Sequence, residues 1–321
     1  TNVIPGPNST EMMLHLGYVR GGWRGLLLAG VCFVSPAVVS VLILAWLYVQ
    51  YGSTPAADWL LYGIKPVVIV IILGALWKLG QKAVRGVGMV ALGMGVVALY
   101  FLGVNEIGLM FGAGLLVVLA REGLGALEAS RMPALVGLGG WATAGLSFSL
   151  GALFLQFLKV GAVLYGSGYV LLAFLQGDLV ERLGWLTQQQ LIDAVAVGQL
   201  TPGPLFTTAT FIGYILAGLP GALVATAGIF LPSLLFVLVS NPLIPRIRES
   251  KVAGAFLDGV NVGALGLMAA VTWTLGRAAI VDLPSLLLMA GAGILMLRFN
   301  VSSFWLVLSW ASAGYLVSVL I

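Results

Sequence analysis

Two copies of one helix-breaking motif carry the residues best suited to bind a small anion. Proline has no backbone N–H and fits the first turn of a helix, so each Pro-Gly-Pro should begin a helix whose first N–H groups have no partner. Such a helix start carries partial positive charge and attracts anions. The substrate-binding candidates are Pro5, Gly6, Pro7, Asn8, Ser9, Thr10 and Glu11 in the first copy, and Thr201, Pro202, Gly203, Pro204, Thr207 and Thr208 in the second.

Thr201 is expected to cap the start of the turn that follows the second motif, because threonine is a favoured residue at helix starts. If the motifs only form tight bends between packed helices, they bind nothing, and the sequence alone leaves that alternative open. The repetition of the motif favours the binding interpretation.

Ionisable residues inside apolar segments are the second group of candidates. Lys159 lies in an apolar stretch, where a lysine is costly and usually functional, and we expect it to offset substrate charge unless it extends to the membrane interface. Glu11 and His15 are four residues apart on one predicted helix face and are candidates for a proton relay, as is Asp193 before the second motif. Alternatively, they only face water. Lys65 is expected at the interface.

The sequence offers no metal site, no cofactor motif and no catalytic apparatus. It contains one His and one Cys, which excludes a cysteine–histidine metal cluster and an intrachain disulfide. No nucleophile–base pair is recognisable, so we expect no enzyme, although a membrane-embedded enzyme stays the less favoured alternative. Cys32 lies in an apolar run and is expected to be buried.

The composition indicates an all-α polytopic membrane protein. Hydrophobic residues make up 60% of the chain and charged residues 8%, against about 25% charged in soluble domains. Apolar runs of spanning length recur, for example residues 26–49 and 221–239. The basic residues lie in short loops between these runs, so the positive net charge does not indicate nucleic acid binding. The lipid bilayer is the expected environment.

An internal repeat organises the chain. Residues 17–25 correspond to residues 213–221, Pro36 to Pro232 and Trp77 to Trp273, each pair 196 positions apart. We predict two transporter repeats, at residues 1–132 and 133–321. The second copy has a long segment before its motif that the first lacks, so we expect the first repeat to be truncated at its N-terminus.

Charge distribution predicts that the two repeats are inverted. Basic residues mark cytoplasmic loops. The loop around Asp58 has no basic residue and is expected outside, whereas its counterpart at residues 246–251 is basic and expected inside. The basic loop at residues 78–85 is expected inside, and its counterpart near Asp282 outside. Inverted repeats with broken helices are typical of secondary transporters, whose substrate sites lie at the breaks.

The same reasoning places the acidic and basic residues at positions 105–106 and 178–182 on the outer side. Residues 187–217 then start and end outside, and neither arm is long enough to span. We therefore predict two re-entrant hairpins with Pro-Gly-Pro tips inside the membrane, one entering from each side. Non-helical backbone is tolerated at that depth only where protein or a water-filled cavity surrounds it.

Three segments resemble the chromate ion transporter (CHR) superfamily, long-chain type. They are residues 5–11 with Gly17 and Tyr18, residues 159–171, and residues 193–204, and together with their spacing they extend the resemblance over essentially the whole chain. The resemblance implies a two-domain carrier of a bacterial or archaeal inner membrane that exports chromate, with sulfate as a related oxyanion. The incomplete first repeat departs from the family pattern.

Other functions and partners stay open. An anion channel would need a continuous pore along the tips, and a transporter could prefer another anion such as sulfate. Protons are a candidate coupling ion, and the protein could form a homodimer. The sequence fixes neither the coupling ion nor the oligomeric state.

Inverted topology predicts opposite labelling of two matched positions. In a Cys32→Ser background, a cysteine replacing Asp58 should react with an impermeant thiol reagent added outside intact cells, and one replacing Arg248 should not. Reaction of both cysteines from the same side would contradict the inverted repeat.

Overall fold

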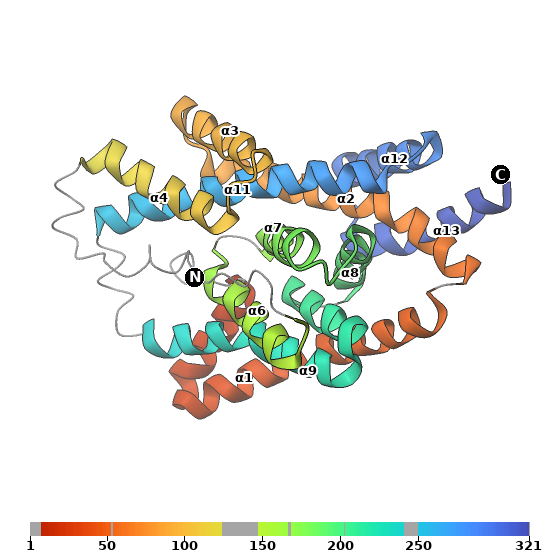
Figure 1. Cartoon of the computed structure of the whole chain (residues 1–321), viewed down its shortest axis with the longest axis horizontal. Helices are drawn as coiled ribbons and strands as arrows, with labels where there is room; N and C mark the ends of the chain where they lie inside the picture. Colours follow the sequence, from red (N-terminus) through yellow and green to blue (C-terminus); the bar gives the residue numbers. More distant parts are fainter. Residues whose placement is uncertain are drawn as a thin grey trace.

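A computed structural model describes residues 8–52, 54–123, 147–165, 168–201, 203–240 and 250–320. Every regular element in these ranges is helical (Figure 1). The helices are α1 (Asn8–Tyr51), α2 (Pro55–Ala83), α3 (Val87–Phe101), α4 (Glu106–Glu122), α6 (Leu150–Val163), α7 (Leu171–Leu175), α8 (Gln188–Leu200), α9 (Thr208–Ser240), α11 (Lys251–Ala279), α12 (Leu283–Phe299) and α13 (Ser303–Leu320). The shorter elements are η2 (Gly168–Val170), the π-helix η3 (Gln176–Arg182) and η4 (Leu205–Thr207).

Four of the described helical segments are long and apolar enough to cross a membrane: Ser9–Tyr51, Ala57–Ala83, Leu205–Val239 and Lys251–Ala279. Large apolar side chains are exposed on α1, α2, α9 and α11, as expected for surfaces that face lipid. The prediction of an all-α polytopic membrane protein is confirmed. Cys32 is exposed on α1, so the expectation that it is buried was wrong; it belongs to this lipid-facing surface.

The helix bounds recur along the chain with the period of the repeat. α2 and α11 begin and end 196 residues apart, and α3 and α12 also begin 196 residues apart. The residues before α2 and α11, Thr54 and Ser250, each accept a hydrogen bond from the backbone N–H three residues later. The orientation of the repeats in a membrane stays a prediction, and the junction expected near residue 132 lies outside the described residues.

α1 and α9 both reverse direction, at equivalent positions. α1 leaves helical geometry at Gly21 and Gly22, and α9 at Ala217 and Gly218, again 196 residues later. Gly22 has φ 59° and Gly218 has φ 61°, in the left-handed region that glycine adopts readily. These reversals explain why the sequence keeps glycine at both positions.

The two arms of each reversed helix pack closely against each other. A Cβ atom on Gly17 would collide with the backbone of Gly25, and one on Gly213 with that of Gly221. In a straight helix, residues eight positions apart are separated by about 12 Å. Each first arm ends at its reversal, and the second arms contain the predicted spans at residues 26–49 and 221–239. The re-entry of the first arms into a membrane stays a prediction.

The helices form two groups that the repeats do not separate (Figure 1). The scaffold bundle consists of α2, α3, α4, α11, α12 and α13, with extensive packing of α11 on α4 and of α2 on α13. The tip bundle consists of α1, α6 and α9, with α9 packed on both other helices. Each repeat contributes helices to both groups, so the groups interleave the two halves of the sequence.

The central segment, formed by α7, η3 and α8, lies between these groups. α8 packs against α2, α11 and α13 of the scaffold bundle and against α1 and α9 of the tip bundle. α7 packs against α11. α8 leads directly into the second Pro-Gly-Pro motif, so this segment links the candidate anion site to the scaffold.

Candidate functional site

Buried polar groups without partners gather in the tip bundle. Helices in membranes normally satisfy their polar groups internally, and an orphaned buried group calls for an explanation such as a bound ion. Outside the central segment, every such side chain in the described part of the chain belongs to α1, α6 or α9. They are Thr10, Glu11, His15, Gln156, Thr208 and Ser233.

The second tip is built from the end of α8, the turn η4 and the start of α9. Thr201 closes α8, and its hydroxyl donates to the carbonyl of Gly198. The sequence predicted that Thr201 caps the start of the following turn, and this was wrong: Thr201 caps the end of α8. The last carbonyls of a helix also lack helical partners, and the Thr201 hydroxyl serves one of them. Gly203 lies against Ala37 of α1, with no room for a side chain. Pro202 lies outside the described residues.

The two threonines after this tip differ in their availability. The Thr207 hydroxyl and N–H both donate to the carbonyl of Pro204, each at 3.0 Å. The Thr208 hydroxyl is fully buried against Gly198 and has no partner among the described residues. Because the 3₁₀ turn also occupies the N–H of Thr208, the N–H groups left for an anion are those before Thr207.

The first tip is described only from the helix that follows it. Pro5, Gly6 and Pro7 lie outside the described residues, and α1 begins at Asn8 as predicted. Ser9 is exposed, whereas Thr10 and Glu11 are buried in the first turn. Both carboxylate oxygens of Glu11 and Nδ1 of His15 are buried and have no hydrogen-bond partner among the described residues. The structure thus places Glu11 and His15 in one helix, as the relay hypothesis requires.

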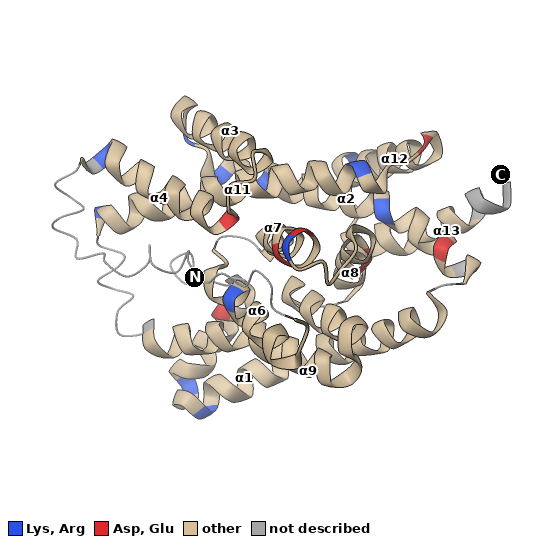
Figure 2. Cartoon of the chain, in the orientation of Figure 1, with Lys and Arg blue, Asp and Glu red and all other residues tan. Residues whose placement is uncertain are grey.

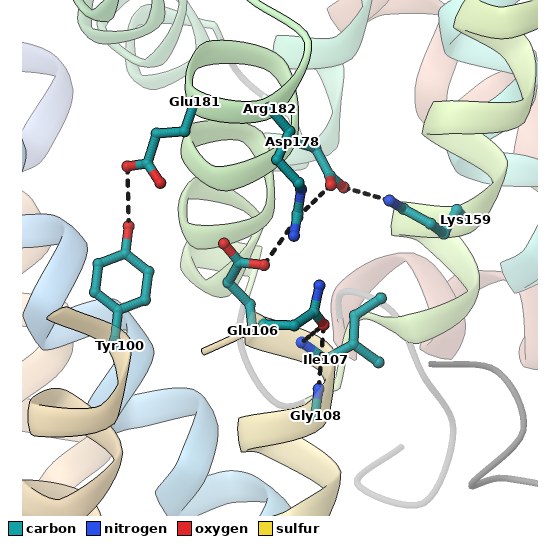
Figure 3. A network of polar contacts seen from close by, with 9 residues as sticks. Tyr100, Glu106, Ile107, Gly108, Lys159, Asp178, Glu181 and Arg182 are labelled. Atoms are coloured by element: carbon teal, nitrogen blue, oxygen red, sulfur yellow. Dashed lines mark hydrogen bonds and ion pairs between the residues drawn. The ribbon is translucent and has the colours of Figure 1, made fainter. Parts of the chain in front are cut away.

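Lys159 belongs to a buried ion network instead of standing free (Figure 3). Its Nζ lies 2.7 Å from Oδ2 of Asp178, and both side chains are buried. The other oxygen of Asp178 accepts a hydrogen bond from Arg182, which also contacts Oε2 of Glu106 at 2.8 Å. The charge of Lys159 is therefore already balanced by Asp178, so this lysine is not a free cation.

The network depends on a close approach between α4 and η3. Gly177 leaves the space that the Glu106 carboxylate occupies, since a Cβ there would overlap it. Asn105 caps α4 through the N–H groups of Ile107 and Gly108 and so fixes the helix start that carries Glu106 (Figure 3). A π-helix such as η3 is rare and frequently occurs at functional sites.

Asp193 forms a second buried centre. Tyr48 donates a hydrogen bond to Oδ2 of Asp193 at 2.9 Å, and Nζ of Lys65 lies 3.6 Å from Oδ1. Lys65 of α2 pairs with Asp193 and has 17% of its side chain exposed, and its expected place at the membrane interface stays a prediction. Both buried lysines of the described part thus pair with aspartates of the central segment.

Figure 2 shows that the charges in the middle of the molecule gather on and beside the central segment, while most others lie at helix ends. Sequence reasoning missed the roles of Glu106, Asp178 and Arg182 because their positions next to short loops made them look like topology markers. The available signal was Lys159 itself, since a buried lysine needs a nearby carboxylate.

The arrangement suits binding of an anion by neutral donors. The buried lysines are neutralised by aspartates, whereas the tip bundle holds free hydroxyl groups beside helix starts. Among the described residues, no group of three or more His, Cys, Asp or Glu is positioned to hold a metal ion.

Comparison with known proteins gives a consistent result. The family model described as chromate transporter matches residues 1–118 and 151–315. The chain is 35% identical over 308 residues to the chromate transport protein of Cupriavidus metallidurans, covering 93% of this chain and 76% of that protein. It is 35% identical over 296 residues to a probable chromate transport protein of Synechococcus elongatus, with 89% and 75% covered. No solved structure matches the chain.

The network predicts a stability cost for removing one buried charge. Lys159→Met leaves Asp178 with only Arg182, and we expect the free energy of unfolding to fall by about 3 kcal/mol. Lys159→Met combined with Asp178→Asn should recover much of this loss. Thermal unfolding in detergent measures the effect, with Lys78→Met at an exposed position as the control. A Lys159→Met protein as stable as the parent would contradict the pairing.

Proposed function

The chain belongs to the chromate transporter family, and we propose that it is a secondary transporter that exports chromate from the cytoplasm and binds the anion in the tip bundle. The protein is a multi-pass plasma membrane protein, as its family and apolar helices indicate. The observation that carries the proposed binding site is the set of buried polar groups in α1, α6 and α9 without partners. A tetrahedral oxyanion offers four acceptors to the hydroxyl and amide donors of this set, whereas the Glu11 carboxyl group can donate only when it is protonated.

The second tip supplies donors of the right kind. The Thr208 hydroxyl is buried without a partner among the described residues, and the N–H groups before Thr207 lie at the start of the turn η4 that leads into α9. Hydrogen bonds to a charged group are stronger than those between neutral groups, and they gain further in a site of low dielectric constant. By the repeat, the start of α1 is the counterpart of this tip: Pro5 corresponds to Pro202, and Thr10, whose hydroxyl is buried without a partner among the described residues, corresponds to Thr207.

Sulfate is the alternative substrate and a channel the alternative mechanism. Chromate and sulfate are both tetrahedral dianions, and backbone N–H groups with hydroxyls do not distinguish them by charge. The packing of Gly203 against Ala37 favours a closed site over a continuous pore, because it joins the second tip to α1.

Proton coupling fits the first turn of α1. A carboxylate buried without a partner is costly in its charged form, and a proton removes that cost. Glu11 is such a group, and His15 lies one turn further along the same helix. We assign the coupling proton to Glu11, with His15 as its relay partner.

Uptake of radiolabelled chromate into everted vesicles tests the function. The parent protein should accumulate chromate, and excess sulfate should compete if the two anions share the site. Thr208→Ala should weaken chromate binding by about 1.5–3 kcal/mol, the usual contribution of a hydrogen bond to a charged group. Gly203→Val should abolish binding, because the new side chain would displace the tip from Ala37.

Controls separate loss of binding from loss of folding. Thr207→Ala should have a smaller effect than Thr208→Ala, since the Thr207 hydroxyl is bonded to Pro204. Thr274→Ala and Gly80→Val, both in the scaffold bundle, should leave binding unchanged. Gly203→Val protein that is folded and binds with parental affinity by calorimetry would show that the anion site lies elsewhere.

Glu11 should be needed for proton coupling but not for exchange. Glu11→Gln should eliminate chromate accumulation driven by a pH gradient while keeping chromate–chromate exchange, because exchange requires no net proton movement. His15→Ala should slow accumulation and alter its pH profile. Unchanged gradient-driven accumulation in Glu11→Gln vesicles would exclude this carboxyl group from coupling.

A further inference from the structure

Two polar clasps join the scaffold bundle to the tip bundle through the central segment. In the first clasp, Asp193 of α8 contacts Lys65 of the scaffold bundle and Tyr48 of the tip bundle. In the second, the Asp178–Arg182 pair of η3 contacts the scaffold bundle and the tip bundle together. Arg182 reaches Glu106 of α4, and Asp178 reaches Lys159 of α6 (Figure 3).

The two clasps lie where the scaffold bundle and the tip bundle are connected. α1, α6 and α9 make no extensive helix–helix contact with the six scaffold helices in the described structure, and the two groups meet mainly through the central segment. A movement of one group against the other must therefore act on the contacts of α7, η3 and α8. The polar contacts among them are directional and break over short distances, unlike apolar packing.

Both clasps fall on the side of the molecule that the charge pattern places outside the cell. Tyr48 lies near the outer end of the predicted span at residues 26–49, and Glu106 begins α4 next to an outer loop. Lys65 lies ten residues into α2, about 15 Å from its outer end. By contrast, the ion pair on the predicted inner side joins Arg121 to Asp258. Both residues belong to the scaffold bundle, so this pair does not connect the two bundles.

We infer that the two clasps form an outer gate, which is closed in the described conformation and must open for release of the anion. Opening separates Asp193 from Lys65 and Arg182 from Glu106, and it also parts α7 and α8 from the scaffold helices they pack on. Asp178 keeps Lys159, and the central segment stays with the tip bundle. The gate residues act by positioning helices and do not touch the anion. This inference rests on the proposed function only in assuming alternating access.

The charge balance lowers the free energy needed to break the contacts of the gate. Each contact that breaks joins one cation to one carboxylate, so opening exposes equal and opposite charges to the water that enters from outside. Arg182 is already partly exposed, with about a third of its side chain accessible, so this side of the network is not sealed by protein. Breaking Lys159 from Asp178 would instead leave two charges in the closed interior.

A cysteine at the second tip can report the state of the gate without any substrate. The reporter is Thr208→Cys in a Cys32→Ser background, since Thr208 is buried and Cys32 is exposed. A membrane-impermeant thiol reagent is added to spheroplasts, which present the outer side, and to everted vesicles, which present the inner side. The rate of modification measures how often each side is open.

Neutralised pairs weaken the gate without leaving a buried charge alone. Lys65→Met with Asp193→Asn, combined with Glu106→Gln and Arg182→Gln, should raise the modification rate in spheroplasts about tenfold, equivalent to about 1.4 kcal/mol in the opening equilibrium. The rate in everted vesicles should fall. The control Arg121→Gln with Asp258→Asn should change neither rate.

Rescue and failure are both measurable. Exchange of charges at one clasp, Lys65→Asp with Asp193→Lys, should keep the spheroplast rate near that of the parent reporter, whereas Lys65→Asp alone should raise it. An unchanged rate in the neutralised variant, a rise in everted vesicles, or a rise from both sides would overturn the outer gate. Because labelling needs no chromate, a protein that fails to transport chromate can still pass this test.

Discussion

The requirement that a buried charge find an opposite charge governs the arrangement of the central segment. Lys65 and Lys159 are held in the protein interior by Asp193 and Asp178, which lie on the same short stretch of chain. Removing a charge from water is costly, and only a close partner with good geometry repays that cost. The central segment must therefore lie between the two bundles that contribute the lysines, and α8 reaches the second tip from that position.

The repeat explains how one chain builds two bundles that cut across its halves. Equivalent glycines let α1 and α9 fold back on themselves, and equivalent helices α2 and α11 meet inside the scaffold bundle. Where α11 crosses α4, a Cβ on Gly259 would overlap the backbone of Ala113, and Gly63 meets the backbone of Trp310 in the same way where α2 crosses α13. Small residues at such crossings are the usual means of packing membrane helices closely.

The sequence predicted the parts of this structure that depend on local patterns. Apolar runs located the helices, because that signal acts over a few neighbouring residues. The repeat of residues 17–25 at residues 213–221 marked the matched segments that contain Gly22 and Gly218, but the reversals themselves were not predicted. The sequence did not predict the pairing of Lys159 with Asp178. That contact depends on the turn between α6 and α7 and on the π-helical geometry of η3, which no periodicity reveals. Thr201 shows the same limit: whether it caps the helix before or after it depends on which backbone groups the fold leaves free.

Because the buried lysines are paired with aspartates, neither is a free cation that would hold a dianion tightly in the protein. A free buried cation would bind chromate tightly and hold it, since two opposite charges attract strongly in a medium of low dielectric constant. Hydroxyl groups and helix starts attract the anion with partial charges only, so release costs less. Thr208 and the N–H groups before Thr207 are donors of this kind, and the lysines are occupied by the carboxylates of the central segment. In the proposed site, the charges of this protein hold the helices together while uncharged groups meet the ion, and such a site would combine specificity for an anion with an affinity low enough for turnover.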